Sequence, residues 1–162
     1  MRKISLVITA RSSYTKYRTV LENLSKKIDV KLNIICCGSA LIDKFGKVEN
    51  EILKDGFKIN KKIHFILDND EIDRPGKELG FGLISFSDYF KETKPDIVVI
   101  MADRYEILAP AIAASFLNIP IAHIQGGELS GNIDEKVRHT VTKISNIHFP
   151  ATNQSRLNII QM

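Results

Sequence analysis

The densest group of chemically reactive side chains in the sequence lies between residues 123 and 135. Three glycines within six positions of this segment, at 126, 127 and 131, would let the backbone approach a ligand closely. The acidic residues and the histidine around them are residue types that transfer protons at enzyme sites. We therefore predict a ligand site on this segment. Its candidate residues are His123, Gln125, Gly126, Glu128, Ser130 and Asp134.

The same segment also has a purely structural interpretation. Asn132 is a favoured residue type for the N-terminal cap of a helix, and Glu135 three positions later would complete something like a capping box. Asp134 would then only complement the positive end of the helix dipole. The sequence leaves both interpretations open, although the crowding of titratable groups favours a functional site.

Two further clusters combine an arginine with a polar neighbour just after an apolar run. Arg11 and Ser12 follow the first run, and Asp103 and Arg104 follow a later one. Arginine pairs with phosphate, and a helix N-terminus favours an anion, while an aspartate there can act as an acid or base. The structural alternative is that serine or aspartate caps a helix and the arginine is solvated. Together the three clusters indicate an anionic ligand.

All three clusters follow predicted β-strands. The apolar runs are rich in Ile and Val and mostly lack polar alternation, as in strands covered on both faces. They lie at residues 4–9, 30–37, 63–67, 96–101, 120–124 and 147–149. Helical periodicity fills the intervals at residues 17–28, 79–90, 106–118 and 132–145, with Pro110 expected in or near a first turn.

This alternation predicts an α/β fold with a doubly wound parallel sheet, in which ligands bind beyond the carboxyl ends of the strands. The turn after the first strand matches neither the G-x-G-x-x-G nor the P-loop pattern, so the common dinucleotide and triphosphate sites are excluded there.

Composition narrows the remaining possibilities. A chain of 162 residues with 44% hydrophobic and 26% charged residues predicts a single globular domain over residues 1–162. The net charge of +4 is spread among 19 acidic residues, so we expect no nucleic-acid partner. No apolar run is long enough for a membrane span or a secretory signal, which predicts a cytoplasmic protein without a membrane partner.

The two cysteines, Cys36 and Cys37, are adjacent. Neighbours in a strand point to opposite faces, so we expect reduced, buried thiols rather than a disulfide. The sequence contains no zinc-ligand spacing, and we predict no metal site.

Three stretches of the sequence resemble the hydrolysing UDP-N-acetylglucosamine 2-epimerases. They are residues 102–106 (Ala-Asp-Arg-Tyr-Glu), residues 118–128 (Asn-Ile-Pro-Ile-Ala-His-Ile-Gln-Gly-Gly-Glu) and residues 133–139 (Ile-Asp-Glu-Lys-Val-Arg-His). The resemblance is strong over residues 97–152 and weaker but collinear over residues 4–14. The family includes bacterial enzymes of sialic-acid and legionaminic-acid biosynthesis.

The resemblance implies a fold and a reaction. The family has two Rossmann-like domains in the glycosyltransferase-B arrangement, with the active site between them. Its reaction eliminates UDP across C1–C2 of the sugar and then adds water, giving the free 2-epimer, such as N-acetylmannosamine. No metal or redox cofactor takes part.

The resemblance also assigns roles to individual residues. Asp103 and Asp134 match acidic positions implicated in proton transfer, and Arg11 and Arg104 match positions that hold the sugar nucleotide. The positions of His123, Glu128 and Arg138 match the loop and helix that face the sugar. We therefore expect Asp103, Asp134, Glu128 and His123 to be catalytic. The expected substrate-binding residues are Arg11, Ser12, Arg104, Gln125, Gly126, Ser130 and Arg138.

Two positions depart from the family pattern. Many relatives have glycine where this chain has Ala102, which narrows the backbone freedom there. Some have glutamate where this chain has Gln125, and an amide cannot act as a base. Either Asp103, Asp134 or Glu128 then does the proton transfer, or Gln125 marks a subgroup with another substrate, such as a UDP-linked diacetamido-trideoxyhexose.

Family members are roughly twice as long, so the resemblance implies that a C-terminal nucleotide-binding domain is missing from this sequence. The expected partners are a UDP-sugar, that second domain and, in the complete protein, further copies of the same chain. Two alternatives are a non-catalytic sugar-nucleotide-binding subunit or truncated product that needs a partner domain, and a glycosyltransferase of the same architecture.

Overall fold

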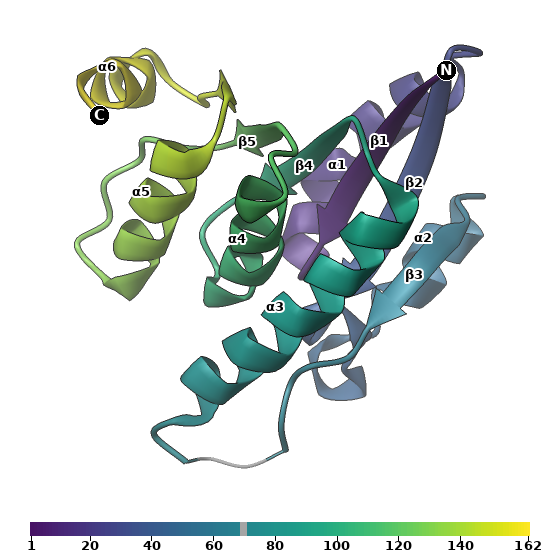
Figure 1. Cartoon of the computed structure of the whole chain (residues 1–162), viewed down its shortest axis with the longest axis horizontal. Coiled ribbons are helices and arrows are strands. Elements are labelled where there is room, and N and C mark those ends of the chain that lie inside the picture. The colour runs from purple at the N-terminus through teal and green to yellow at the C-terminus, as the bar shows by residue number, and fades with distance from the viewer. Residues whose placement is uncertain (69–70) are drawn as a thin grey trace.

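A computed structural model of the chain describes residues 1–68 and 71–162. Its centre is a parallel sheet of six strands in the order β3-β2-β1-β4-β5-β6 (Figure 1). This is the strand order of the dinucleotide-binding doubly wound folds, so the predicted fold class is confirmed. The strands are β1 (Arg2–Ile8), β2 (Val30–Cys37), β3 (Ile59–Ile63), β4 (Ile97–Met101), β5 (Ile121–Ile124) and β6 (Ile147–Phe149).

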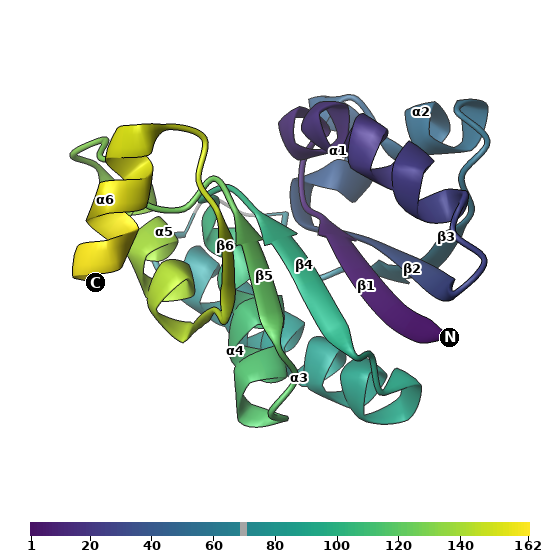
Figure 2. The same ribbon diagram turned by 90° about the horizontal axis from the view of Figure 1, so that it is seen from above.

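Helices cover both faces of the sheet. In Figure 2, α1 and α2 lie on one side of it, whereas α3, α4 and α5 lie on the other. The helices are α1 (Arg11–Ser25), α2 (Glu49–Lys54), α3 (Arg74–Thr93), α4 (Leu108–Phe116), α5 (Ile133–Ile144) and α6 (Asn153–Gln161). Short 3-10 turns precede α2 and α4: η1 (Gly38–Leu41), η2 (Asp43–Phe45) and η3 (Tyr105–Ile107).

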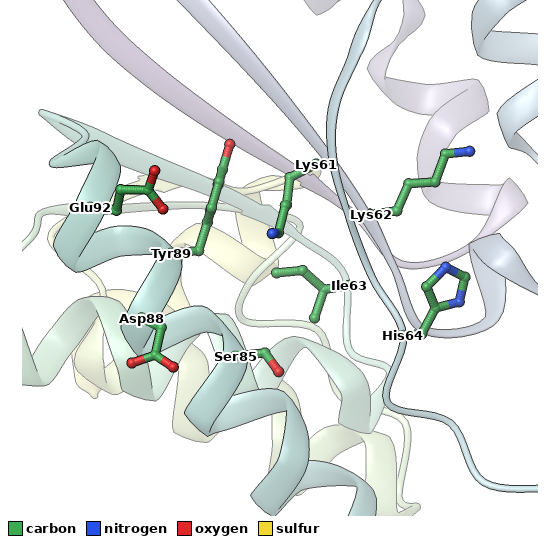
Figure 3. Close-up of a pocket in the computed structure, with 8 residues that line it drawn as sticks. All are labelled: Lys61, Lys62, Ile63, His64, Ser85, Asp88, Tyr89 and Glu92. Carbon is green, nitrogen blue, oxygen red and sulfur yellow. The ribbon is translucent and has the colours of Figure 1, made fainter.

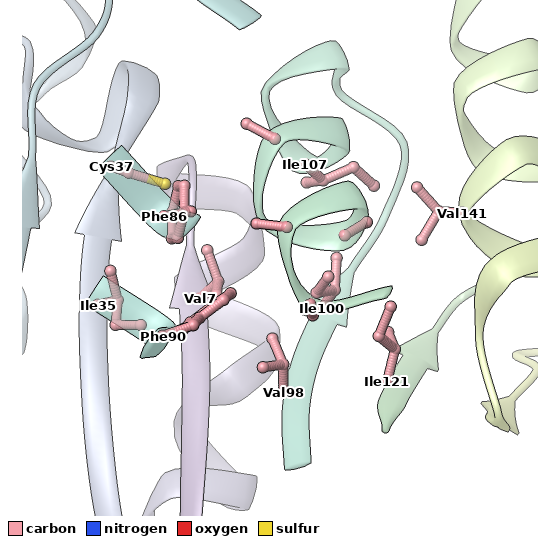
Figure 4. Packing of buried hydrophobic residues seen from close by; sticks show 14 of the residues in the cluster. Val7, Ile35, Cys37, Phe86, Phe90, Val98, Ile100, Ile107, Ile121 and Val141 are labelled. Atoms are coloured by element: carbon pink, nitrogen blue, oxygen red, sulfur yellow. The ribbon is translucent and has the colours of Figure 1, made fainter. Parts of the chain in front are cut away.

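Each face of the sheet has its own hydrophobic core. On the side of α3, α4 and α5, the helices pack against alternate residues of the central strands, such as Val98 and Ile100 of β4. The aromatic pair Phe86 and Phe90 of α3 belongs to the same core (Figure 4). On the other side, Tyr14, Tyr17 and Leu21 of α1 pack over β1 and β2. Burial of both faces explains why the central strands are continuously apolar.

The main error of the sequence-based prediction concerns the third strand. A strand was expected at residues 63–67, but β3 spans Ile59–Ile63. It is an edge strand, and three of its five residues are exposed, so it lacks the apolar run that identifies central strands. The apolar residues that follow it serve another purpose: Phe65 is buried against α3, where Gly82 leaves room for its ring.

The other five strands were predicted to within two residues, whereas α1 and α3 begin six and five residues before the expected ranges, and α2 was missed. The helix expected at 106–118 is divided between η3 and α4, with Pro110 in the first turn of α4. Cys36 and Cys37 are free and buried, as expected, and burial raises the pKa of the Cys36 thiol to about 12. Among the described residues, no helix is long and apolar enough to cross a membrane.

Candidate active site

Most of the predicted site residues lie where β4 and β5 end, whereas Arg11 and Ser12 begin α1 after β1. Ala102 follows β4 and donates its N–H to the carbonyl of Ile124, the last residue of β5, at 3.1 Å. Both strands are followed by a non-glycine residue in the left-handed region, with φ of 71° at Ala102 and 64° at Gln125. These two sharp turns direct the chain out of the sheet. The point lies beside the β1–β4 boundary, where the strand order reverses and ligands bind in this fold class.

A buried arginine connects helix α5 to the segments that follow β4 and β5. Arg138 of α5 donates one N–H to the carboxylate of Asp103 and another to the carbonyl of Glu128, and it also lies 3.4 Å from the hydroxyl of Ser130. Its side chain is only 4% exposed, whereas that of Asp103 is 29% exposed. Arg138 therefore holds the loop and the Asp103 carboxylate in place, and Asp103 is the member of the pair that solvent or a ligand can reach.

His123 lies entirely inside the protein. Its Nε2 is 3.1 Å from the carbonyl of Ala102 and its Nδ1 is 3.2 Å from the hydroxyl of Thr142. Because a carbonyl can only accept, Nε2 carries the proton and Nδ1 accepts from Thr142. Desolvation lowers the pKa of His123 to about 4, which keeps the ring neutral. The sequence suggested His123 as a catalytic group, but its contacts are those of a residue that positions the turn before Asp103.

Two glycines allow the loop after β5 to pack closely. A Cβ atom on Gly126 would lie 2.7 Å from the hydroxyl of Thr142 and 2.9 Å from Nδ1 of His123. A Cβ atom on Gly127 would overlap the carbonyl oxygen of Ser155 in α6, and Gly127 has φ of 80°. The glycines are thus needed for contact with the protein itself, and Gly126 is a packing residue in this structure.

The predicted cap of α5 is present. The Asn132 side chain accepts from the N–H of Glu135 at 3.3 Å. The Glu135 carboxylate reaches further back than in a capping box and accepts the N–H groups of Ser130 and Gly131, which lowers its pKa. Asn132 and Glu135 together satisfy the helix start, so Asp134 is not required for it. None of the hydrogen bonds within residues 1–68 and 71–162 uses the half-buried Asp134 side chain.

Asp134 instead lies in the electrostatic surroundings of Arg104. Burial on its own would lower the pKa of Arg104, but hydrogen bonds to Glu106 and nearby charges, Asp134 among them, raise it overall. The Arg104 guanidinium donates hydrogen bonds from Nε and Nη2 to the buried Glu106 carboxylate at 3.0–3.2 Å. The Arg104 side chain is nevertheless 47% exposed, so it can meet an anion while Glu106 fixes its direction.

At the start of α1, Arg11 pairs with Glu51 of α2 at 2.7 Å, and its side chain is 62% exposed. Ser12 is exposed, while its neighbour Ser13 bonds both the N–H and the carbonyl of Ala10 at the helix start. The N-cap of α1 is therefore Ala10 and not a serine, and Ser13, at the third helical position, bonds to the backbone of that cap. One turn later, Lys16 donates to the side chain of Gln125 at 2.7 Å and joins α1 to the end of β5.

Lys16, Glu106 and Thr142 were not among the predicted site residues, although Glu106 belongs to one of the stretches that carry the resemblance. Lys16 is one of many lysines on helical surfaces, and Glu106 and Thr142 reach the site from helical segments whose side chains were expected to pack. Only their partners in space identify them.

A separate hollow of about 320 Å³ lies beside the edge strand β3 (Figure 3). Its lining includes Lys61 and Lys62 of β3 and Asp88 and Glu92 of α3, and the ammonium of Lys61 lies over the Tyr89 ring at 5.4 Å. Strands β2 and β1 separate it from β4, so it is not part of the site described above. In the described part of the chain, no group of three His, Cys, Asp or Glu side chains could hold a metal ion.

Comparison with known proteins gives a consistent result. The sequence profile of the UDP-N-acetylglucosamine 2-epimerase family matches residues 22–162. The chain is 41% identical over its whole length to a UDP-N,N'-diacetylbacillosamine 2-epimerase (hydrolyzing) of Legionella pneumophila. It is 37% identical, over 99% of its length, to a GDP/UDP-N,N'-diacetylbacillosamine 2-epimerase (hydrolyzing) of Campylobacter jejuni.

These relatives are longer than the chain, which spans 43% and 42% of their lengths. The crystal structure of the UDP-GlcNAc 2-epimerase from Neisseria meningitidis, bound to UDP-GlcNAc, has the same fold over 98% of the chain and 43% of its own length. The TM-score is 0.86 at 20% identity.

Proposed function

The chain belongs to the UDP-N-acetylglucosamine 2-epimerase family, and we propose that it forms one wall of the active site of a hydrolysing 2-epimerase. That enzyme would convert a UDP-linked 2-acetamido sugar to UDP and the free 2-epimer. The observation that carries the proposal is the arrangement at the ends of β4 and β5: an accessible carboxylate, Asp103, held by the buried Arg138, with Arg104 and Asp134 nearby. This set offers acids for proton transfer and a cation for a phosphate.

For the substrate, we propose a UDP-linked sugar with two acetamido groups. The relatives from Legionella pneumophila and Campylobacter jejuni, at 41% and 37% identity, are both named for N,N'-diacetylbacillosamine. Gln125, in place of the glutamate of some family members, agrees with a subgroup of its own. UDP-N-acetylglucosamine, for which the family is named, is the second candidate.

The reaction makes three demands on the site. The C2 proton needs a base, the departing pyrophosphate needs positive charge, and the added water needs a group that directs it. We assign the proton transfers to Asp103 and Asp134, which are both half-buried; Asp103 precedes Arg104 in the sequence, and the charge of Asp134 acts on Arg104. Arg104, Arg11 and Ser12 are the groups proposed to meet the nucleotide. No step of this proposal uses a metal or redox cofactor.

Glu128 and Ser130 belong to the proposed site through the loop that carries them. Arg138 binds the carbonyl of Glu128 and approaches the hydroxyl of Ser130, so the Glu128 carboxylate is not consumed by that contact. We propose Glu128 as a further acid facing the sugar. His123, Gly126 and Arg138 act indirectly in this proposal, by positioning the backbone and Asp103.

One wall does not enclose a substrate, and an active site of this kind needs water to be excluded. We propose that a second domain completes it, as the greater length of the relatives suggests. Assembly of the complete protein into a homo-oligomer is also part of the proposal, on the family resemblance alone. If the chain serves only as a binding subunit, it would bind the UDP-sugar without any turnover in the presence of such a domain.

Substitution of Asp134 by Asn tests the catalytic assignment. The variant is placed in a chimera in which residues 1–162 replace the matching part of the Legionella pneumophila relative. We expect UDP release to fall by at least 100-fold, because an amide cannot transfer the proton, while the melting temperature stays within about 2 °C since Asn132 and Glu135 still cap α5. Glu135→Gln is the control, which should change stability more than turnover. If Asp134→Asn turned over the substrate at nearly the unmodified rate, Asp134 would only complement the dipole of α5 and would not be catalytic.

A further inference from the structure

The side-chain amide of Gln125 is held in one orientation by a lysine from another element. Lys16 of α1 donates to Oε1 of Gln125 at 2.7 Å. An ammonium group has only donors, so the atom it contacts must be the amide oxygen, and the amide NH₂ group lies at the opposite side of the side chain. The backbone of Gln125 is fixed as well, because its N–H donates to the carbonyl of Phe149 at 2.9 Å.

The orientation leaves the NH₂ group as the part of Gln125 that is available to a ligand. None of the hydrogen bonds found within residues 1–68 and 71–162 uses Nε2 of Gln125. The residue is half-buried and begins the turn after β5, at the same sheet edge as Asp103. An NH₂ group donates and cannot accept, so its natural partner is a neutral acceptor such as an amide carbonyl.

We infer that Gln125, with Lys16 as its positioning residue, is a specificity-determining donor for the carbonyl of the second acetamido group of the sugar. This inference rests on the proposed function, because it needs a UDP-sugar bound at the ends of β4 and β5. UDP-N-acetylglucosamine lacks that second group and would leave the donor without a partner. A site built around a hydrogen bond rejects analogues that cannot form it.

A carboxylate at this position would have the opposite effect. Glutamate would keep the contact with Lys16, now as an ion pair, but it would present a second oxygen where glutamine presents NH₂. That oxygen would repel an amide carbonyl. Glutamine at position 125 therefore directs a hydrogen-bond donor at the sugar, and glutamate would direct an acceptor. Lys16 can hold either side chain.

Nuclear magnetic resonance of the 15N-labelled chain tests this directly, with millimolar UDP-N,N'-diacetylbacillosamine, UDP-N-acetylglucosamine and UDP in separate titrations. We expect the backbone amides of Asp103 and Asp134 to shift with both sugar nucleotides, and the side-chain NH₂ resonances of Gln125 to shift only with the first. Backbone shifts without that selective side-chain response would overturn the inference and leave the proposed function standing. No shift with any ligand would also overturn the inference, while the proposed function is tested separately by turnover of the chimera.

Variants provide the second readout, the ratio of the dissociation constants for the two sugar nucleotides. We expect the chain to prefer the diacetamido sugar at least tenfold. Gln125→Glu and Lys16→Met should each reduce the preference to about twofold or less, whereas Lys16→Arg should retain it. Lys26→Met, at the far end of α1, is the matched control. An unchanged ratio in Lys16→Met, with the fold intact by its amide spectrum, would contradict a positioning role.

Discussion

At the scale of single residues, the candidate site depends on groups that are buried from solvent. Arg138 was expected to bind substrate, yet it is buried and its hydrogen bonds run to Asp103, Glu128 and Ser130. His123 was expected to be catalytic and is sealed between Ala102 and Thr142. Sequence patterns identify such residues because their types are distinctive, but the direction of a side chain is decided by packing.

Ala102 carries backbone strain that a smaller residue would relieve. Its φ of 71° lies in the left-handed region, which disfavours any residue with a Cβ atom. We expect Ala102→Gly to raise the free energy of unfolding by about 0.5–1 kcal/mol in urea denaturation. Ala113→Gly, within the right-handed helix α4, should instead lower it by about 1 kcal/mol or more. Equal losses in both variants would refute strain at Ala102.

The buried His123 should make stability depend on pH. Its pKa is about 4 in the fold against 6.5 as the ordinary value. Between these values the unfolded chain binds more protons than the folded chain. The contribution of the neutral His123 ring to stability is therefore complete above pH 6.5 and is lost as the pH falls towards 4. Between pH 6.5 and pH 5, we expect the free energy of unfolding to fall by about 2 kcal/mol more in the unmodified chain than in His123→Gln.

Urea unfolding at both pH values measures that difference, and it cancels the contribution of His148, whose pKa is also lowered by burial. A direct titration of the His123 ring by nuclear magnetic resonance covers the case in which the variant does not fold. A midpoint near 6.5 in the folded chain would contradict the neutral, buried ring.

At the scale of elements, the central strands and the long helices follow from the sequence. The bounds of β2 and β6 agree with the predicted ranges 30–37 and 147–149, although only the second half of β2 is buried and β6 is a largely exposed edge strand. β3 was misplaced and α2 missed, since both lie at the margin of the sheet, where only one side of the element is covered.

The loop between β5 and α5 illustrates what sequence can and cannot show. Its three glycines predicted close approach to a ligand, but Gly127 is required by α6, where the Ser155 carbonyl occupies the space of a Cβ atom. The contact crosses 28 residues of sequence, and no local pattern reports it. The cap at Asn132, in contrast, was predictable because its partners lie within three residues.

Two glycines of this loop provide a matched pair of substitutions. Gly127 and Gly131 have φ of 80° and 70°, but only Gly127 has a neighbour within 4 Å of its missing Cβ. Both alanine variants carry backbone strain of about 1 kcal/mol, and Gly127→Ala must also displace α6. We expect Gly127→Ala to lower the free energy of unfolding by at least about 2 kcal/mol more than Gly131→Ala. Similar losses would show that α6 moves away without cost.

At the scale of the whole molecule, topology explains why distant parts of the sequence meet. The order β3-β2-β1-β4-β5-β6 places the ends of β1, β4 and β5 along one edge, so the clusters near residues 11, 103 and 125–138 converge (Figure 1). The fold class and this convergence were predictable from alternation alone. The pairing of Asp103 with Arg138 was not, because it depends on the side-chain packing of α5 against the loop.

The central claim is that this chain supplies one wall of a hydrolysing 2-epimerase site. Its most direct test uses the chimera of residues 1–162 and the remainder of the Legionella pneumophila relative. The chimera is incubated with UDP-N,N'-diacetylbacillosamine in deuterated water, and the products are followed by proton nuclear magnetic resonance. We predict release of UDP together with a free 2-epimer that carries deuterium at C2. A folded chimera that binds the nucleotide sugar but leaves it intact, or that releases the sugar with its C2 proton retained, would contradict the account.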